Sequence, residues 1–266
     1  MPSWNIHIHQ TERLLARGRA ASRVVADANV FLFANLMPDV PVGYMVPGVA
    51  HVPYRETHLT DPVPIPTPHE RAYWDAFVVP ALAAARAAGE EVSPRGPRRL
   101  LCDADARPAI IGAAATSVPV PPPCAPVAAV SPVRADLDLA LGVWSHLLAD
   151  AIWNHRVGEY LDMIGGEPGE GFRIKKQADF DGFGRTLALS SVPRETATLL
   201  GAVSRYPQYR LERQGVHDSI VVAHEIVRSS GAIDHPPYRL LTEAFFASVL
   251  EEVVVQTDLL LADRLG

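Results

Sequence analysis

Apolar residues recur at helical spacing along most of the chain, which predicts a mostly α-helical protein. The clearest helix spans residues 136–156, where acidic side chains in the first turn match the positive end of the helix dipole. A helix capped by Thr11 is expected over residues 11–25, although Gly18 weakens its middle. Further helical or apolar segments are expected at residues 30–37, 68–89, 193–206, 212–229 and 238–265. Strand signals are weak, so the predicted fold class is all-α.

Long irregular segments separate these helices. Residues 38–68 are rich in proline, glycine and aromatic side chains without periodicity, and long ordered loops of this kind are often functional. Residues 90–134 contain the proline-rich run 117–126 and are expected to form a surface excursion between two halves of one domain. Residues 158–190 are again rich in glycine. We therefore expect residues 1–266 to form a single helical domain with long loops.

Composition limits the classes of function. The net charge is −6 and 20% of the residues are charged, which argues against a general nucleic-acid coat because such a coat needs a dense basic face. Among the 24 basic residues only Lys175 and Lys176 are lysines, and they are adjacent. The N-terminus lacks the pattern of a signal peptide and no long apolar run occurs, so we expect a cytoplasmic protein without a membrane span. Cys102 and Cys124 form no cluster, so a zinc site would use histidine and carboxylate ligands.

His146 and Asp150 stand four residues apart on the 136–156 helix, so their side chains share one face. The residues around them are largely apolar, which predicts a buried helix, and a buried aspartate is destabilising unless it is paired or binds a metal. Taken alone, this pair is explained more often by a hydrogen bond between the two side chains than by a metal ion. His155 lies on a different side of the helix and can simply cap its end.

Other segments offer further ligands. Asp39 follows a proline at the end of an apolar segment, where an aspartate usually forms a cap or a turn but can also be a rigidly held ligand. His58 lies in a polar loop, and His51, seven residues earlier, is an alternative candidate for the same ligand position. His7 and His9 alternate with isoleucines, so they point the same way if this segment is extended.

Asp39, His58, His146 and Asp150 together form a set of two histidines and two aspartates, which is suited to zinc. The second oxygen of Asp150 can bridge to another ion held with His7. Pairs of zinc ions roughly 3.5–4 Å apart are widely used for phosphoester hydrolysis. Histidine and aspartate also suit manganese, iron and cobalt, so one or two ions of zinc or another divalent transition metal are expected.

The order of these residues resembles the zinc-dependent phospholipase C family, whose all-helical fold is shared with fungal zinc single-strand nucleases. Members of the family have an N-terminal ligand, an aspartate, a histidine and then a helix with His-x-x-x-Asp. In this chain the same order is kept by His7, Pro38-Asp39, His58 and His146-x-x-x-Asp150. Bacterial members also begin Met-Pro-x-x-x-x-His, as this chain does, which favours His7 over His9. The segment 172–185 is similar to a block of the same bacterial subgroup.

The chain also departs from the family. In the secreted phospholipases, cleavage exposes an N-terminal amine that binds zinc, and no cleavable leader is recognised here. The late His-x-x-x-Glu of the family is absent, because neither His217 nor His224 is followed by glutamate at that spacing. Asn154 or His155 stands where a further family histidine would fall. The resemblance therefore implies one or two metal ions rather than three.

The resemblance implies a phosphoester hydrolase in which zinc activates a water molecule, with a small phosphoester or a phospholipid headgroup as substrate. Asp39 and Asp150 are the expected catalytic carboxylates, Asp39 orienting the water or taking its proton and Asp150 bridging the ions. The expected phosphate-binding cations are Arg55, Lys175, Lys176 and Arg185. Two alternatives stay open: a non-catalytic, metal-stabilised binding or sensory protein, and a helical scaffold whose histidines and aspartates pair only with each other.

Overall fold

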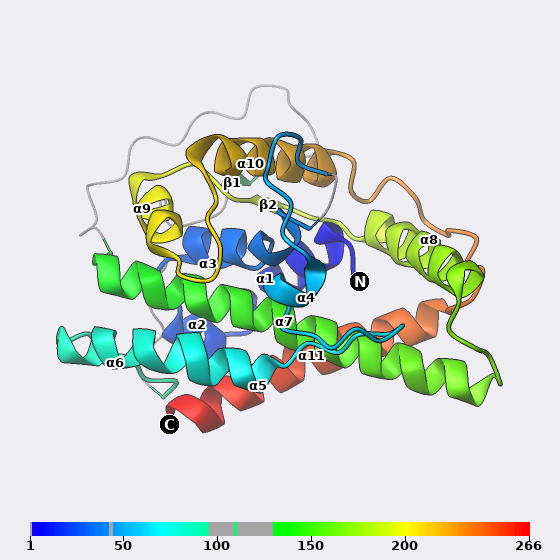
Figure 1. Cartoon of the computed structure of the whole chain (residues 1–266), viewed down its shortest axis with the longest axis horizontal. Helices are drawn as coiled ribbons and strands as arrows, with labels where there is room; N and C mark the ends of the chain where they lie inside the picture. Colours follow the sequence, from blue (N-terminus) through cyan, green and yellow to red (C-terminus); the bar gives the residue numbers. More distant parts are fainter. Residues whose placement is uncertain (1, 43–44, 96–108, 111–129) are drawn as a thin grey trace.

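The computed structural model describes residues 2–42, 45–95, 109–110 and 130–266, and this part of the chain is mostly helical, which confirms the predicted all-α class (Figure 1). The helices are α1 (Trp4–Ala16), α2 (Ala20–Val24), α3 (Ala28–Ala34), α4 (Tyr54–Thr57), α5 (Glu70–Tyr73), α6 (Val79–Ala87), α7 (Pro132–Met163), α8 (Glu170–Thr186), α9 (Ala197–Arg205), α10 (Arg213–Arg228) and α11 (Glu243–Leu265). Single turns of 3-10 and π-helix form η1 (Met37–Asp39) and η2 (Trp74–Val78). The short strands β1 (Ala109–Ile110) and β2 (Ser191–Val192) pair in antiparallel fashion.

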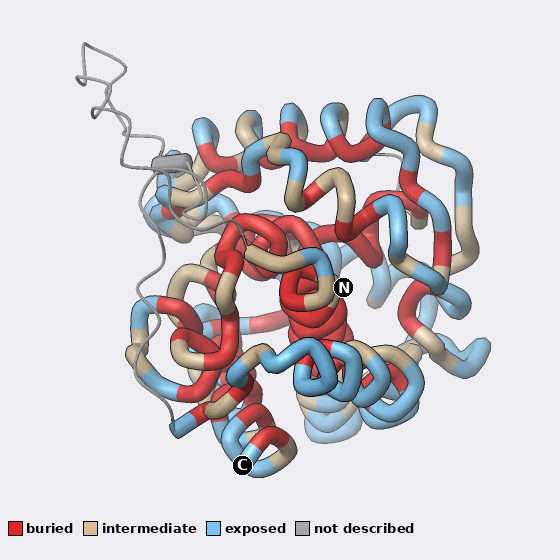
Figure 2. The backbone as a smooth tube through the Cα atoms, turned by 90° about the vertical axis from the view of Figure 1, so that its left-hand side faces the viewer, coloured by how far each residue is buried: buried red, intermediate tan, exposed pale blue. Residues whose placement is uncertain are grey.

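The long helix α7 lies at the centre of the fold and extends beyond both ends of the predicted 136–156 helix. It is capped by Ser131, whose side chain accepts a hydrogen bond from the backbone N–H of Arg134. Helices α3, α6, α9 and α11 pack against α7. Figure 2 shows that the buried backbone gathers in the middle of the molecule. Since α7 is covered along much of its length, its polar residues His146 and Asp150 are enclosed by the core.

Helix α3 approaches α7 closely at Gly142. A Cβ atom at this glycine would lie 2.5 Å from the carbonyl oxygen of Phe31 and 2.6 Å from Cβ of Ala34, so a larger residue does not fit without movement. The contact places Asn35, the C-cap of α3, beside α7, where its side-chain amide donates to the Gly142 carbonyl oxygen at 3.3 Å. The same packing brings η1, and with it Asp39, next to the middle of α7.

The N-terminal helix differs from its prediction. It begins at Trp4 rather than Thr11, and Gly18, with φ +67°, separates it from α2. His7 and His9 therefore lie on a helix instead of an extended segment, and they point in different directions. His7 is fully buried, whereas the side chain of His9 is 24% exposed.

The glycine-rich segment 158–190, for which no helix was expected, contains the whole of α8. Gly184 allows α8 to pack against the start of α1, since a Cβ atom there would lie 2.5 Å from Oγ of Ser3 and 3.0 Å from Cβ of Asn5. The absence of a side chain thus permits a close helix contact that offsets the low helix propensity of glycine.

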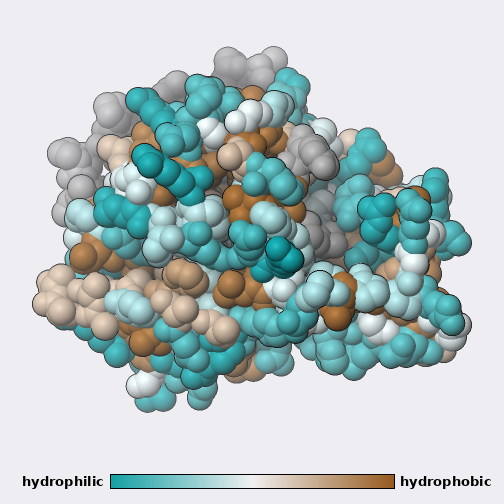
Figure 3. Space-filling view, viewed as in Figure 1, coloured by the Kyte–Doolittle hydropathy of each residue, from teal (hydrophilic) through white to brown (hydrophobic). Residues whose placement is uncertain are grey.

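The predicted surface excursion at residues 90–134 lies largely outside the described residues, as do Cys102 and Cys124. Within the described ranges, no helix combines the length and the apolar character needed to cross a membrane. The face shown in Figure 3 carries mainly hydrophilic side chains with hydrophobic ones scattered among them, and mildly hydrophobic side chains follow the alanine-rich helix α6 at its lower left.

Candidate metal centre

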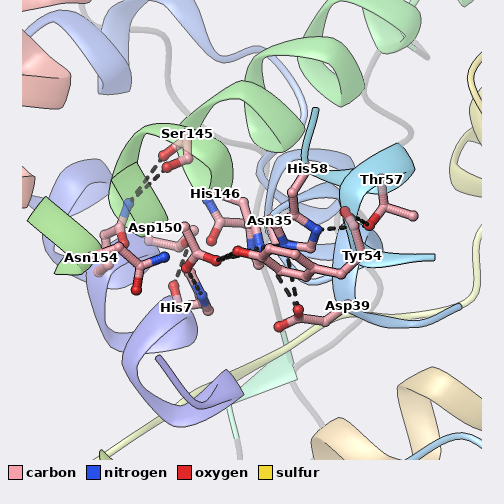
Figure 4. Close-up of polar contacts among 12 residues, drawn as sticks. His7, Asn35, Asp39, Tyr54, Thr57, His58, Ser145, His146, Asp150 and Asn154 are labelled. Carbon is pink, nitrogen blue, oxygen red and sulfur yellow. Dashed lines mark hydrogen bonds and ion pairs between the residues drawn. The ribbon is translucent and has the colours of Figure 1, made fainter. Parts of the chain in front are cut away.

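The five predicted metal ligands lie together in one buried cluster, which we call the His/Asp cluster. Its members are His7, Asp39, His58, His146 and Asp150 (Figure 4). They come from α1, from η1, from the C-cap of α4 and from two positions one turn apart on α7. Asp39 is 8% exposed and the other four residues are fully buried. Residues far apart in the sequence thus share one enclosed site beside the middle of α7.

Ligand atoms of four residues lie close to the two histidine rings, with the Nε2 atoms of His58 and His146 2.9 Å apart. The Nε2 atom of His58 lies 3.6 Å both from Oδ1 of Asp39 and from Oδ2 of Asp150. The corresponding distances from Nε2 of His146 are 4.0 and 3.9 Å. In a tetrahedral zinc site, metal–nitrogen bonds of about 2.0–2.1 Å separate neighbouring ligand atoms by about 3.3 Å. The nitrogen–nitrogen distance is shorter than this and the four nitrogen–oxygen distances are longer, so the two histidines are spaced to share an ion with a neighbouring carboxylate.

His7 adds a second group of ligand atoms. Its Nε2 atom lies 3.5 Å from Oδ1 of Asp150, and its ring stacks on the ring of His146 with the centroids 4.1 Å apart. The two oxygens of Asp150 face different histidines, Oδ1 toward His7 and Oδ2 toward His58. Ligand atoms of His7, Asp39 and His146 also lie within 4.8 Å of one another. The two groups share His146, and the two oxygens of Asp150 reach a histidine of each group, His7 and His58.

A hydrogen bond to the outer nitrogen of His146 sets its tautomer. Nδ1 of His146 lies 2.8 Å from the carbonyl oxygen of Asn35, which can only accept, so this nitrogen is the donor and Nε2 carries a lone pair. The hydroxyl of Thr57 lies 3.2 Å from the carbonyl oxygen of Tyr54 and 2.7 Å from Nδ1 of His58, and it can donate its one proton to either. In one tautomer of His58 its Nε2–H donates to Nε2 of His146, and in the other the two Nε2 atoms both offer lone pairs, which suits a shared cation.

Burial sets the protonation of the cluster. It lowers the pKa of His58 well below 6.5, and the neighbouring His146 imidazole lowers it further. Burial likewise lowers the pKa of His146, and His7 adds to this shift. Burial raises the pKa of Asp39 to about 6, although His146 acts against the rise. Burial alone would raise the pKa of Asp150 as well, but His146 and His7 hold it below its usual value. An ionised carboxylate buried beside neutral imidazoles favours a metal cation as the shared positive charge.

Several polar atoms of the cluster have no hydrogen-bond partner within the described part of the chain. They are both ring nitrogens of His7, Oδ1 of Asp39 and Oδ1 of Asp150, and all are buried. Buried polar atoms are almost always hydrogen-bonded, because an unpaired one costs about 1–3 kcal/mol. Their types are those that bind zinc and related ions, so the residues present fit a metal ion.

A cavity of about 400 Å³ lies against the cluster on the side of Asp39. Asp39 is the one cluster member in its wall, which also contains Trp4 from α1 and Arg185 from α8. Among the other predicted cations, Lys176 is buried, and Arg55 and Lys175 are exposed and lie outside this wall. Of the four predicted phosphate-binding cations, only Arg185 therefore lies in the wall of this cavity.

The rival histidines lie elsewhere. His51 is exposed, and His9 faces Glu12 with their nearest side-chain N and O atoms 4.0 Å apart. Three further histidines also lie outside the cluster: His155, His217 and His224. His155 and His217 each lie 3.2 Å from a glutamate oxygen. The structure thus selects His7 over His9 and His58 over His51 as members of the cluster.

Three residues beside the cluster escaped the sequence analysis as contributors to the site. Asn35 and Thr57 hold the outer nitrogens of the histidines, and the hydroxyl of Tyr54 donates to Oδ2 of Asp150 at 3.0 Å. Tyr54 stands four residues before His58, a spacing that one helical turn would bring together, but nothing in the loop sequence predicts that turn.

Comparison of the chain with models of known protein families, with curated proteins and with solved structures finds no match. The resemblance to the zinc-dependent phospholipase C family therefore stays a prediction.

Proposed function

We propose that the protein is a zinc-dependent phosphoester hydrolase that uses a metal-activated water molecule. The observation that carries the proposal is the His/Asp cluster itself, in which the Nε2 atoms of His58 and His146 lie close to each other and to carboxylate oxygens of Asp39 and Asp150 inside the core. His7, on the far side of Asp150, offers a ligand for a second ion. Zinc suits this set of ligands best, and other divalent transition metals are its competitors.

Zinc bound in such a site would lower the pKa of a coordinated water toward about 7. Asp39 lies between the cluster and the cavity, where its carboxylate can orient a water molecule and accept its proton. Burial raises the pKa of Asp39 to about 6, close to the range in which a general base works at neutral pH. The two oxygens of Asp150 face different histidines, so Asp150 can bind an ion on either side.

The cavity supports a small phosphoester or a phospholipid headgroup as substrate. Its volume of about 400 Å³ is at the lower end of typical small-molecule sites. Arg185 in its wall supplies a guanidinium, which can bind two phosphate oxygens side by side. Trp4, Met45 and Ile226 line other parts of the wall and provide apolar surface for the rest of the substrate.

The test combines metal analysis with hydrolysis assays. The purified protein should contain zinc or a related metal and should cleave bis-p-nitrophenyl phosphate or a phosphatidylcholine analogue. His146→Ala and Asp150→Ala should each lose both the metal and the activity. His155→Ala, on the exposed side of the same helix, should keep both. Full activity in a metal-free preparation would contradict the proposal.

The second candidate function is a non-catalytic protein stabilised by its metal. It is favoured by the complete burial of four of the five cluster members, since structural zinc sites are closed and catalytic ones keep an open position. This candidate predicts bound metal and a large gain in thermal stability without hydrolysis of either substrate. A protein that binds no metal would instead support the plain helical scaffold.

A further inference from the structure

Tyr54 joins two members of the His/Asp cluster that come from different parts of the chain. Its hydroxyl donates to Oδ2 of Asp150 on α7 at 3.0 Å. Its ring stacks on the ring of His58, with the centroids 3.8 Å apart and the planes 24° from parallel. Figure 4 shows the phenol lying across the site between the two residues. One side chain thus touches both a carboxylate and an imidazole of the proposed metal centre.

The hydrogen bond acts on the oxygen that faces the histidines. Oδ2 of Asp150 lies 3.6 Å from Nε2 of His58 and 3.9 Å from Nε2 of His146, whereas Oδ1 faces His7. A carboxylate oxygen has two lone-pair directions, so Oδ2 can accept from Tyr54 with one and bind an ion with the other. Rotation of the carboxylate would break this bond and exchange the two oxygens.

The single turn of α4 holds the imidazole of His58 in three ways. The Tyr54 ring stacks on the imidazole, the Thr57 hydroxyl forms a 2.7 Å hydrogen bond with Nδ1 of His58, and the Tyr54 carbonyl oxygen lies 3.2 Å from the same hydroxyl. The Tyr54 side chain belongs to neither hydrophobic cluster found in the described part of the molecule. Its ring and hydroxyl instead contact His58 and Asp150 of the His/Asp cluster.

We propose that Tyr54 is a positioning residue that fixes the carboxylate of Asp150 and the imidazole of His58 for metal binding. The inference rests on the proposed metal centre. Partners of this kind orient metal ligands, and their loss typically weakens metal binding by about 10–100-fold. The hydroxyl is the part of Tyr54 that sets the carboxylate, and the ring is the part that supports the imidazole.

The test uses Tyr54→Phe, which keeps the ring and its stacking on His58 but removes the hydroxyl. Zinc affinity is measured by competition with a chromophoric chelator, and the cobalt(II)-substituted protein is examined by visible absorption, which reports coordination geometry. The control is Tyr160→Phe, because the Tyr160 hydroxyl also makes one 3.0 Å hydrogen bond, to the carbonyl oxygen of Leu240. We expect about 10–100-fold weaker zinc binding and a changed cobalt spectrum in the first variant, and neither change in the control.

The outcomes separate this inference from the proposed function. If the unaltered protein binds neither zinc nor cobalt, the metal centre itself is wrong. If it binds both, and Tyr54→Phe has the same affinity and the same cobalt spectrum, only the role of Tyr54 is overturned. An equal loss of affinity in both variants with unchanged spectra would show a purely structural effect and would also overturn it. Circular dichroism of the metal-free variants checks that each is folded.

Discussion

The Nε2 atoms of His58 and His146 face each other 2.9 Å apart although the residues belong to a loop and to the central helix. Each ring is oriented from behind, by Thr57 in one case and by the Asn35 carbonyl in the other. The Asn35 carbonyl turns the lone pair of His146 Nε2 toward His58, and Nε2 of His58 donates to it in one tautomer and offers a second lone pair in the other. Outer hydrogen bonds of this kind orient histidine ligands in metal sites.

Replacing His58 with alanine should remove metal from the site. His58 contributes one of the two facing nitrogens and also contacts the carboxylates of Asp39 and Asp150. Elemental analysis of His58→Ala should show loss of at least one metal ion per chain. His51→Ala is the control, since His51 is exposed and lies outside the cluster. Equal metal contents in the two variants would contradict the assignment of His58.

Gly142→Ala should destabilise the protein. The added Cβ atom would lie 2.5 Å from the Phe31 carbonyl oxygen, so α3 and α7 must move apart, and such overpacking costs about 1–3 kcal/mol. Because α3 ends at Asn35, whose carbonyl orients His146, zinc affinity should fall as well. Urea denaturation measures the free energy of unfolding, and chelator competition measures the affinity.

Gly158→Ala is a matched control for this prediction on the same helix. A Cβ atom at Gly158 would meet nothing within 4 Å, so the substitution adds helix propensity without a clash. It should raise the free energy of unfolding by up to about 1 kcal/mol. If both glycine variants lost stability equally, close packing of α3 and α7 would not be the cause.

The sequence predicted the parts of the site that depend on local geometry. Spacing on one helix is enough to place His146 and Asp150 on the same face, and both lie one turn apart in the structure. Asp39 and His58 are different, because their position relative to α7 depends on contacts distant in sequence. Their own segments offered them only as candidate ligands, and the order of residues shared with a family supported them.

Errors in the predicted elements have identifiable causes. An alternating pattern suggested that His7 and His9 share a side, but on helix α1 residues two apart point in different directions, so only His7 reaches the core. The glycines of α8 suggested an irregular segment, because propensity cannot anticipate that Gly184 packs directly on Ser3. In both cases tertiary contacts decided what the local pattern left open.

Glu70 should make stability depend on acidic pH. It accepts hydrogen bonds from Nε1 of Trp144 at 2.6 Å and from the guanidinium of Arg264 at 2.8 and 2.9 Å. Burial alone would raise the pKa of Glu70, but these bonds hold it below 4.5. A lowered pKa stabilises the fold above the unfolded value of about 4.5, and this contribution is lost as the pH falls through the folded value.

The variant Glu70→Gln measures this contribution. At pH 7 it should lower the free energy of unfolding by about 1–2 kcal/mol, since it removes the charge but keeps the shape of the side chain. The difference from the unaltered protein should shrink below pH 4.5, where the glutamate becomes protonated in the unfolded chain and then in the folded one. Urea midpoints at several pH values between 3 and 7 test this, and a difference independent of pH would contradict it.

Arg185→Ala should weaken substrate binding without removing metal. Arg185 is the one predicted cation in the wall of the cavity beside Asp39, so it can reach a phosphate held there. A charge-assisted hydrogen bond contributes about 1.5–3 kcal/mol, which corresponds to a rise in KM of about tenfold or more. Lys175→Ala is the control, because Lys175 is exposed on the same helix and lies outside the wall.

Steady-state kinetics on bis-p-nitrophenyl phosphate, together with elemental analysis, separates the possible roles of this arginine. A raised KM with normal metal content in Arg185→Ala, and unchanged kinetics in Lys175→Ala, would place the phosphate in the cavity. Loss of metal in Arg185→Ala would instead mean that the arginine supports the fold around the cluster. Unchanged kinetics in both variants would show that the substrate approaches the His/Asp cluster from another side, and the assignment of this cavity as the substrate site would then be wrong.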